Sequence, residues 1–304
     1  MDASQNEAEA ALLAGALTEA LTEAAACSEP NEEEPEGWSG TVADLERLLF
    51  EAFPREWAEP WDRPGLLVGD PGARVGRIAF ALDATRESVR AAAECGANVL
   101  VTHHPAYLEP PSPLVPRGEA ASLASTCVWE AVARGVSLVA MHTNLDRSPL
   151  ATALLPSLLG LAPACGIESG RDPSQGRLGS VACLPTPESL GDLAGDCLRV
   201  FGRVGQVFGN PGQTVSRVAF FTGSLGDSGS DALRAGADAV VCGECGYHRA
   251  LDLTERGCAV ILLGHDVSEL PLVGVLMERV VDAGVPLTRC VALDEGERWF
   301  SVTR

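Results

Sequence analysis

Two adjacent histidines close an apolar run in the segment VLVTHHP. His103 and His104 come directly after a pattern typical of a buried strand. Neighbouring residues on a strand point to opposite faces, so both imidazoles can serve one site only where the strand gives way to a loop. The other three histidines of the chain, His142, His248 and His265, lie at or near the ends of further apolar runs. This placement predicts a site built from imidazoles.

Carboxylates follow two of these histidines at the same spacing. His142 precedes Asp146 by four residues in HTNLD, and His265 precedes Glu269 by four residues in GHDVSE. Zinc, iron and manganese all favour a mixture of imidazole and carboxylate ligands. One tetrahedral zinc needs only four ligands, so the larger set predicts two divalent ions (Zn, Mn or Fe) per chain. The expected metal ligands are His103, His104, Asp146, His265 and Glu269.

Three further residues have expected roles around the metal ligands. His142 either ligates an ion or orients Asp146 from outside the ligand set. Glu244 falls at the position of an internal repeat that corresponds to His104, which makes it a candidate general base. His248 follows CGECGY and is a candidate proton shuttle. Glu244 and His248 are therefore the expected catalytic residues.

Each motif also has a simpler structural interpretation. GHDVSE can begin a helix with Glu269 in its first turn, and HTNLD can form a turn. Cys242 and Cys245 in CGEC can form a redox or zinc pair, although no second C-x-x-C completes a four-cysteine site. The irregular spacing of the ten cysteines favours reduced thiols. The metal interpretation is preferred because every histidine falls near a predicted strand end.

An internal repeat explains how ligands far apart in the chain can meet. RIAF at 77–80 returns as RVAF at 217–220, and GANVLV at 96–101 returns as GADAVV at 236–241, both at an offset of 140 residues. Each copy lies in a strand–helix–strand context, which implies parallel strands with a right-handed crossover. Open α/β sheets bind ligands at the carboxyl ends of their strands. The repeat therefore predicts a duplicated β-α-β core.

Other segments frame this core. The apolar spacing over 42–53 predicts a helix, whereas 55–70, rich in proline, tryptophan and glycine, predicts an ordered loop in which Trp57 and Trp61 either line a pocket or pack. Residues 176–202 read as strand, turn and helix. The Gly/Ser-rich segment 221–233 is either a weak phosphate-binding loop or a plain loop.

The predicted fold class is α/β, with duplicated β-α-β core lobes and a middle α/β insertion. We expect four parts along the chain. Residues 1–38 form an acidic, disordered or helical extension, and 39–156 form the first α/β half with metal ligands. Residues 157–214 form the middle α/β segment, and 215–304 form the second half, which completes the metal site.

Charge and composition exclude several classes of function. The net charge of −20 argues against nucleic acid or an anionic membrane as a partner. All 22 basic residues are arginine, so a Schiff-base lysine and a Walker-type phosphate loop are excluded. Residues 1–36 hold ten acidic residues and no arginine, and lack the basic start of a secretory signal. These features predict a cytoplasmic protein whose acidic extension can dock a partner.

Taken in order, the motifs ALDAT, GANVLVTHHP, HTNLD, GADAVVCGECGYH and GHDVSE resemble the NIF-three-like family, often filed as GTP cyclohydrolase type-two homologues or dinuclear metal centre hexameric proteins. The resemblance covers about residues 41–304. It implies a NIF-three-like fold, metal ligands at the five positions given above, and a ring-shaped homohexamer with metal sites facing an interior cavity. The chain departs from the family pattern at CGEC and at Ser268, where threonine is usual.

Two functions are consistent with these features. The first is a metal-dependent hydrolase of a small nucleotide-like or phosphorylated substrate, GTP cyclohydrolase type-two-like by name only. The alternative is a non-catalytic metal-binding scaffold or a metal-handling or regulatory protein. In both cases the expected partners are copies of the same chain, with a small-molecule substrate in the first.

Overall fold

The computed structural model describes residues 38–167, 173–296 and 298–300. Almost all of the expected acidic extension at 1–38 thus lies outside the described residues. The described chain forms two compact units. The first unit consists of residues up to Leu145 together with those from Leu272 onward, and the second runs from Asp146 to Pro271. The expected four-part division of the chain stays a prediction.

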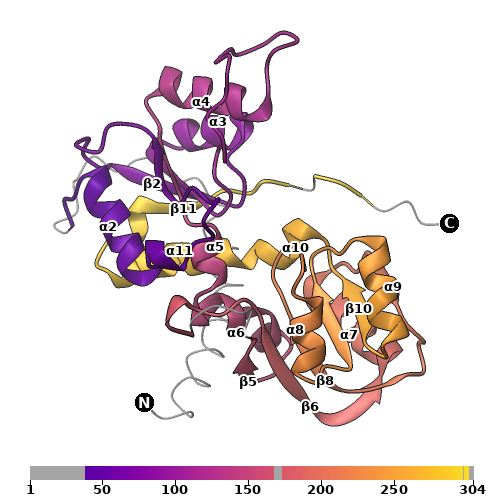
Figure 1. The fold of residues 1–304 in the computed structure, drawn as a ribbon. Helices are drawn as coiled ribbons and strands as arrows, with labels where there is room; N and C mark the ends of the chain where they lie inside the picture. The colour runs from indigo at the N-terminus through magenta and orange to yellow at the C-terminus, as the bar shows by residue number, and fades with distance from the viewer. Residues whose placement is uncertain (1–37, 168–172, 297, 301–304) are drawn as a thin grey trace. The chain divides into compact units, whose positions relative to one another are not determined.

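A five-stranded sheet forms the centre of the first unit, in the order β1-β4-β3-β2-β11. Its neighbouring strands β2 and β11 are labelled in Figure 1. Strands β2, β3, β4 and β11 run parallel, and β1 pairs antiparallel with β4 at one edge. Their bounds are β1 Gly65–Val68, β2 Arg77–Ala81, β3 Ala97–Thr102, β4 Ser137–Ala140 and β11 Cys290–Ala292. Because β11 comes from the far end of the chain, residues near both ends of the described chain build this sheet.

Helices α3 (Arg86–Glu94) and α4 (Leu123–Arg134) are the crossovers between the parallel strands of the first unit. Apolar residues of both helices pack with residues of β2, β3 and β4 in one core. The unit also contains α2 (Val42–Ala52), the short helix α5 (Thr143–Asp146), which ends at the border of the second unit, and α11 (Pro271–Asp282). A capping box between Thr41 and Asp44 starts α2.

The second unit has a six-stranded sheet in the order β5-β6-β8-β9-β10-β7. Strands β8, β9 and β10 run parallel, and the others are antiparallel to their neighbours. Their bounds are β5 Pro163–Gly166, β6 Ser180–Ser189, β7 Gln206–Phe208, β8 Thr214–Phe220, β9 Ala239–Cys242 and β10 Ala259–Leu262. The strands expected in the middle segment are therefore part of the same sheet as the second repeat.

Helices cover both faces of this second sheet. One core contains residues of α8 (Gly229–Arg234) and α9 (Tyr247–Glu255), and the other contains residues of α6 (Pro149–Leu158) and α7 (Leu190–Phe201). Ser189 caps α7 by accepting a hydrogen bond from Asp192 N. The short helix α10 (His265–Glu269) follows β10. No helix among the described residues is both long and apolar enough to cross a membrane.

The two sheets repeat the same core, which confirms the predicted duplicated α/β fold. In the first unit β3 lies between β2 and β4, and in the second β9 lies between β8 and β10. All four of these pairings are parallel. The likeness extends to one edge of each sheet. There β1 pairs antiparallel with β4, and β7 pairs antiparallel with β10.

The segment from 55 to 70 differs in part from the expected loop. Residues Arg55–Trp57 form a 3-10 turn, but Gly65–Val68 form the edge strand β1. Leu66 pairs with Val139 of β4 across this edge. The loop prediction was wrong here because four residues between Pro64 and Gly69 are too few to show the alternation that identifies a strand.

Candidate metal centre

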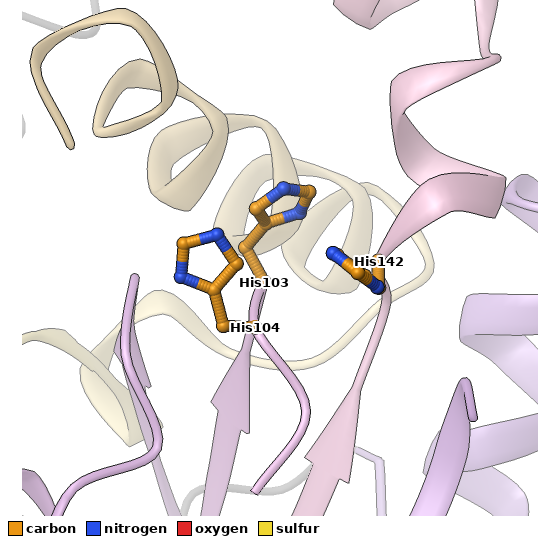
Figure 2. Close-up of side chains that lie close together, drawn as sticks. All are labelled: His103, His104 and His142. Carbon is orange, nitrogen blue, oxygen red and sulfur yellow. The ribbon is translucent and has the colours of Figure 1, made fainter. Parts of the chain in front are cut away.

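Three histidines of the first unit gather at the carboxyl ends of two neighbouring strands (Figure 2). His103 and His104 directly follow β3, and His142 follows β4 after one intervening residue. The ring centroids lie 5.0 Å apart for His103 and His104, 5.3 Å for His103 and His142, and 5.8 Å for His104 and His142. Each ring offers a nitrogen within 4.8 Å of the others. We call these three residues the imidazole cluster.

The adjacent histidines can share a site because both lie beyond the last residue of β3. The last residue of β3 is Thr102, and its hydroxyl donates to His104 O at 2.7 Å. The backbone N–H of His103 donates to Ala81 O at 3.3 Å, and that of His104 donates to Leu82 O at 2.9 Å. The chain therefore stays attached to the end of β2 while its alternation is lost, and both rings reach the same cluster.

An oxygen atom holds Nδ1 of every ring in the imidazole cluster. His103 Nδ1 lies 2.9 Å from the backbone oxygen of Met141, His104 Nδ1 lies 2.7 Å from Asp83 Oδ1, and His142 Nδ1 lies 2.8 Å from Asp62 Oδ1. A carbonyl or an ionised carboxylate can only accept, so Nδ1 carries the proton in each neutral ring. The lone pair then belongs to Nε2. This is the arrangement that orients metal-binding histidines.

Asp62 belongs to the loop before β1, and its side chain is fully covered. Besides contacting His142, its carboxylate accepts hydrogen bonds from Thr143 N at 3.0 Å, from Thr143 Oγ1, and from Arg63 N at 2.6 Å. Burial acts to raise the pKa of Asp62, but the hydrogen bond and charge of His142 and the bonds from Thr143 and Arg63 outweigh it and lower the pKa to about 2. The carboxylate is therefore ionised at neutral pH.

Neither of the two carboxylates that hold the imidazole cluster was predicted from the sequence. Asp83 follows the predicted strand in ALDAT, so its place at a strand end was a usable signal. Asp62 lies in a loop without periodicity, and no sequence pattern connects it to His142. The same loop carries Trp61, whose ring makes a T-shaped contact with that of His142 at a centroid distance of 5.9 Å while 56% of the residue is exposed. Of the two alternatives for the tryptophans, Trp61 thus borders the cluster.

The second unit brings together other predicted residues at the ends of its own repeat strands. His265 Nε2 lies 3.0 Å from Glu269 Oε2, and His265 Nδ1 lies 3.3 Å from Glu244 Oε1. Glu269 is 4% exposed. Metal–ligand bonds of about 2.0–2.2 Å place neighbouring ligand atoms roughly 3 Å apart, so the spacing of His265 and Glu269 suits ligands of one ion.

Asp146 is also buried, and its Oδ1 accepts a hydrogen bond from Thr222 Oγ1 at 3.0 Å. Thr222 comes shortly after β8, so the first strand of the second repeat supplies a partner for this expected ligand. A hydrogen-bonded carboxylate keeps a fixed orientation, which is what a metal ligand requires.

Glycines and a serine let the backbone approach Glu269 and His265 closely. Gly223 has φ +57°, and a Cβ atom at this position would lie 2.0 Å from Glu269 Oε1. The buried hydroxyl of Ser268 accepts from Gly223 N at 2.9 Å and donates to His265 O at 2.8 Å. Ser268, where the family pattern usually has threonine, thus connects the end of β8 to α10.

Two expected features lie further from these contacts. His248 is exposed on α9, with its ring 5.4 Å from that of Tyr247. Cys242 is buried and Cys245 half-buried, and burial raises the pKa of both thiols, which disfavours the reactive thiolate. The nine described cysteines are free, as expected for reduced thiols. The clusters of potential ligands found among the described residues contain no cysteine.

The donor atoms of both units fit a divalent transition metal. The first unit offers three imidazoles with fixed Nδ1 protons, and the second offers an imidazole beside a buried carboxylate. Nitrogen and oxygen ligands of this kind suit zinc, iron and manganese rather than calcium or magnesium, which prefer oxygen alone. Residues of this chain could therefore hold metal ions, and the role of each expected ligand stays a prediction.

Known proteins resemble this chain over most of its length. A relative from Streptomyces coelicolor, named GTP cyclohydrolase 1 type 2 homolog, is 34% identical over 218 residues, which cover 68% of this chain and 73% of the relative. A relative of the same name from Clostridium perfringens is 26% identical over 240 residues, with 78% and 90% covered.

Solved structures share the fold. The Staphylococcus aureus hypothetical protein SA1388 aligns with a TM-score of 0.75 at 24% identity, covering 86% of this chain and 99% of that one. A Bacillus cereus protein related to NIF3 aligns with a TM-score of 0.74 at 20% identity, again covering 86% and 99%. The family model described as Duf34/NIF3 (NGG1p interacting factor 3) matches residues 40–289. The chain therefore belongs to the Duf34/NIF3 family.

Proposed function

We propose that this protein is a metal-dependent hydrolase that acts on a small nucleotide-like or phosphorylated substrate. Two divalent ions per chain, of zinc, manganese or iron, are its cofactors, and their ligands are His103, His104, Asp146, His265 and Glu269. The observation that carries the proposal is the imidazole cluster, in which an oxygen acceptor holds Nδ1 of every ring and leaves Nε2 as the donor atom.

Each residue has a different role in the proposed chemistry. Divalent metal ions held by these ligands would supply Lewis acidity, to polarise a carbonyl or phosphoryl oxygen and to lower the pKa of water. Asp62 and Asp83 orient His142 and His104, and His142 is available as a further ligand. Glu244, with a side chain 60% exposed and Oε1 3.3 Å from His265 Nδ1, accepts a proton at its free carboxylate oxygen. His248 passes the proton to solvent.

The relatives named GTP cyclohydrolase 1 type 2 homolog support a nucleotide-like substrate, since that name refers to a nucleotide. The proposed assembly is a homohexamer in the cytoplasm, consistent with the family resemblance. A net charge of −20 makes nucleic acid and anionic membranes poor partners.

A second candidate is a metal-binding scaffold or metal-handling protein without turnover. The exposure of Glu244 and His248 favours it, because a general base works best where water is excluded. Under this proposal the oriented imidazoles determine which metal ion the protein binds and how tightly it binds. The two candidates share the ligand set and differ in whether any substrate is consumed.

Metal loading followed by a substrate screen tests both. The purified protein is loaded with Zn, Mn or Fe, its metal content per chain is measured by elemental analysis, and it is screened against nucleotides and phosphoesters. The hydrolase proposal expects turnover that is lost in His104→Ala and kept in Arg47→Ala, which removes two exposed ion pairs on α2. Tight metal binding without turnover supports the scaffold. Absence of metal binding contradicts both candidates.

A further inference from the structure

We propose that Glu295, near the far end of the described chain, is a positioning residue for His104. Its carboxylate holds the short segment that fixes the imidazole, although the two residues are far apart in sequence. The effect of Glu295 on metal affinity rests on the proposed function.

The first step is the contact of Glu295 with the end of β2. The Glu295 carboxylate accepts hydrogen bonds from the backbone N–H groups of Leu82, at 2.5 Å, and Asp83, at 3.2 Å. The Glu295 side chain is 8% exposed. The N–H of Leu293 donates to Phe80 O at 2.8 Å, so the chain beyond β11 continues alongside β2 and delivers Glu295 to this place. A charged acceptor makes such bonds stronger than a neutral one.

The second step is that both residues held by Glu295 bind His104. Leu82 O accepts from His104 N at 2.9 Å, and Asp83 Oδ1 lies 2.7 Å from His104 Nδ1. The two peptide N–H groups thus point to Glu295 while the carbonyl and the side chain of the same segment bind the histidine. Glu295 therefore fixes the backbone from which the ring is oriented.

The third step is that the backbone carbonyl of Asp83 is held as well. The hydroxyl of Ser88 donates to Asp83 O at 2.7 Å, and this serine belongs to the capping box that starts α3. With its N–H held by Glu295 and its carbonyl held by Ser88, the Asp83 backbone has little freedom to move. Ring orientation by an outer carboxylate needs such a support, because a mobile carboxylate fixes neither tautomer nor ring angle.

Histidine tautomers in the metal-free protein test the inference. Nitrogen-15 NMR of the imidazoles at about pH 8, above the ordinary pKa of about 6.5, distinguishes Nδ1–H from Nε2–H rings. In Glu295→Ala we expect the His104 signal to lose its Nδ1–H character while that of His142, held by Asp62, is unchanged. Glu295→Gln keeps one acceptor oxygen and should give an intermediate signal. Arg298→Ala removes only the ion pair to Glu295 and should resemble the wild type.

An unchanged His104 signal in folded Glu295→Ala overturns the inference, and so does an equal change at His104 and His142, which would indicate general loosening. If Glu295→Ala does not fold, the Gln variant decides by the same comparison. Zinc affinity measured by calorimetry should fall about tenfold in Glu295→Ala, the lower end of the range for outer residues of metal sites. If the wild type binds none of zinc, manganese and iron, the proposed function fails, but the tautomer measurement still decides the role of Glu295.

Discussion

Asp62 Oδ1 lies 2.8 Å from His142 Nδ1, a contact that joins a loop before β1 to the end of β4. The two residues are 80 positions apart, and the Asp62 side chain is fully covered. The same carboxylate binds the backbone and the hydroxyl of Thr143. One buried charge therefore fixes both the histidine and the first residue of α5, so the loop is part of the candidate site rather than a connection between elements.

We expect Asp62→Asn to weaken metal binding by about 10- to 100-fold, because the neutral amide no longer enforces the Nδ1–H tautomer of His142. The NH2 group of the amide faces either His142 Nδ1 or the donors of Thr143, depending on which way the amide lies, and this mismatch should cost about 1–3 kcal/mol of unfolding free energy. Calorimetric zinc titration and urea unfolding measure the two effects. Asp70→Asn is the matched control, because Asp70 is exposed and its side chain accepts from Gly72 N within its own turn. Equal losses in both variants would contradict the role of Asp62.

Acid should weaken the start of α2 through Asp44. The backbone N–H of Thr41, its hydroxyl and Arg47 lower the pKa of Asp44 to about 2. A carboxyl group whose pKa is lower in the folded state contributes stability above its unfolded pKa of about 3.9, and this contribution is lost as pH falls towards 2. The difference in urea midpoint between wild type and Asp44→Ala should therefore shrink between pH 4 and pH 2. A difference that stays constant over this range would show that the charge of Asp44 has no part in the cap.

Gly223→Ala should displace Glu269. The added methyl group would lie 2.0 Å from Glu269 Oε1, and the residue would also have to keep a φ of +57°. Gly226→Ala is a close control, since its φ is +52° and a methyl group there would enter open space, with no atom of a non-adjacent residue within 4 Å. Both variants carry backbone strain of about 1–3 kcal/mol, but only Gly223→Ala should also lose metal content. Elemental analysis of the two purified proteins tests this, and equal metal content would contradict the placement of Glu269 in the site.

The repeat explains why much of the fold could be predicted from the sequence. Two matches at one offset identified β2 and β8 as equivalent, and β3 and β9 likewise. Parallel strands joined by helices leave few topologies, and all four parallel pairings of the two copies follow that expectation. The histidines were predicted as site residues for the same reason, because the end of an apolar run in the sequence marks the end of a strand.

The features that were not predicted from the sequence have a common physical cause. Each depends on a contact between distant segments that leaves no local pattern. The edge strand β1 exists because β4 offers an open edge, and its four residues are too short to alternate visibly. β11 joins the first sheet beside β2, which no spacing in the sequence indicates. Asp62 and Glu295 act through side-chain and backbone hydrogen bonds across the chain, so their types and neighbours give no signal of their partners.

Ser268 provides the last test, because its hydroxyl bridges Gly223 N and His265 O from a fully buried position. Ser268→Ala leaves both backbone groups without this partner and should cost about 1–3 kcal/mol of unfolding free energy. Ser268→Thr keeps the hydroxyl and should cost less, with metal content closer to that of the wild type. Ser157→Ala is the control, since that hydroxyl bonds within its own helix, to Ala153 O. Urea unfolding and elemental analysis give the comparison, and a threonine variant that loses as much metal as the alanine variant would show that the hydroxyl is not what positions His265.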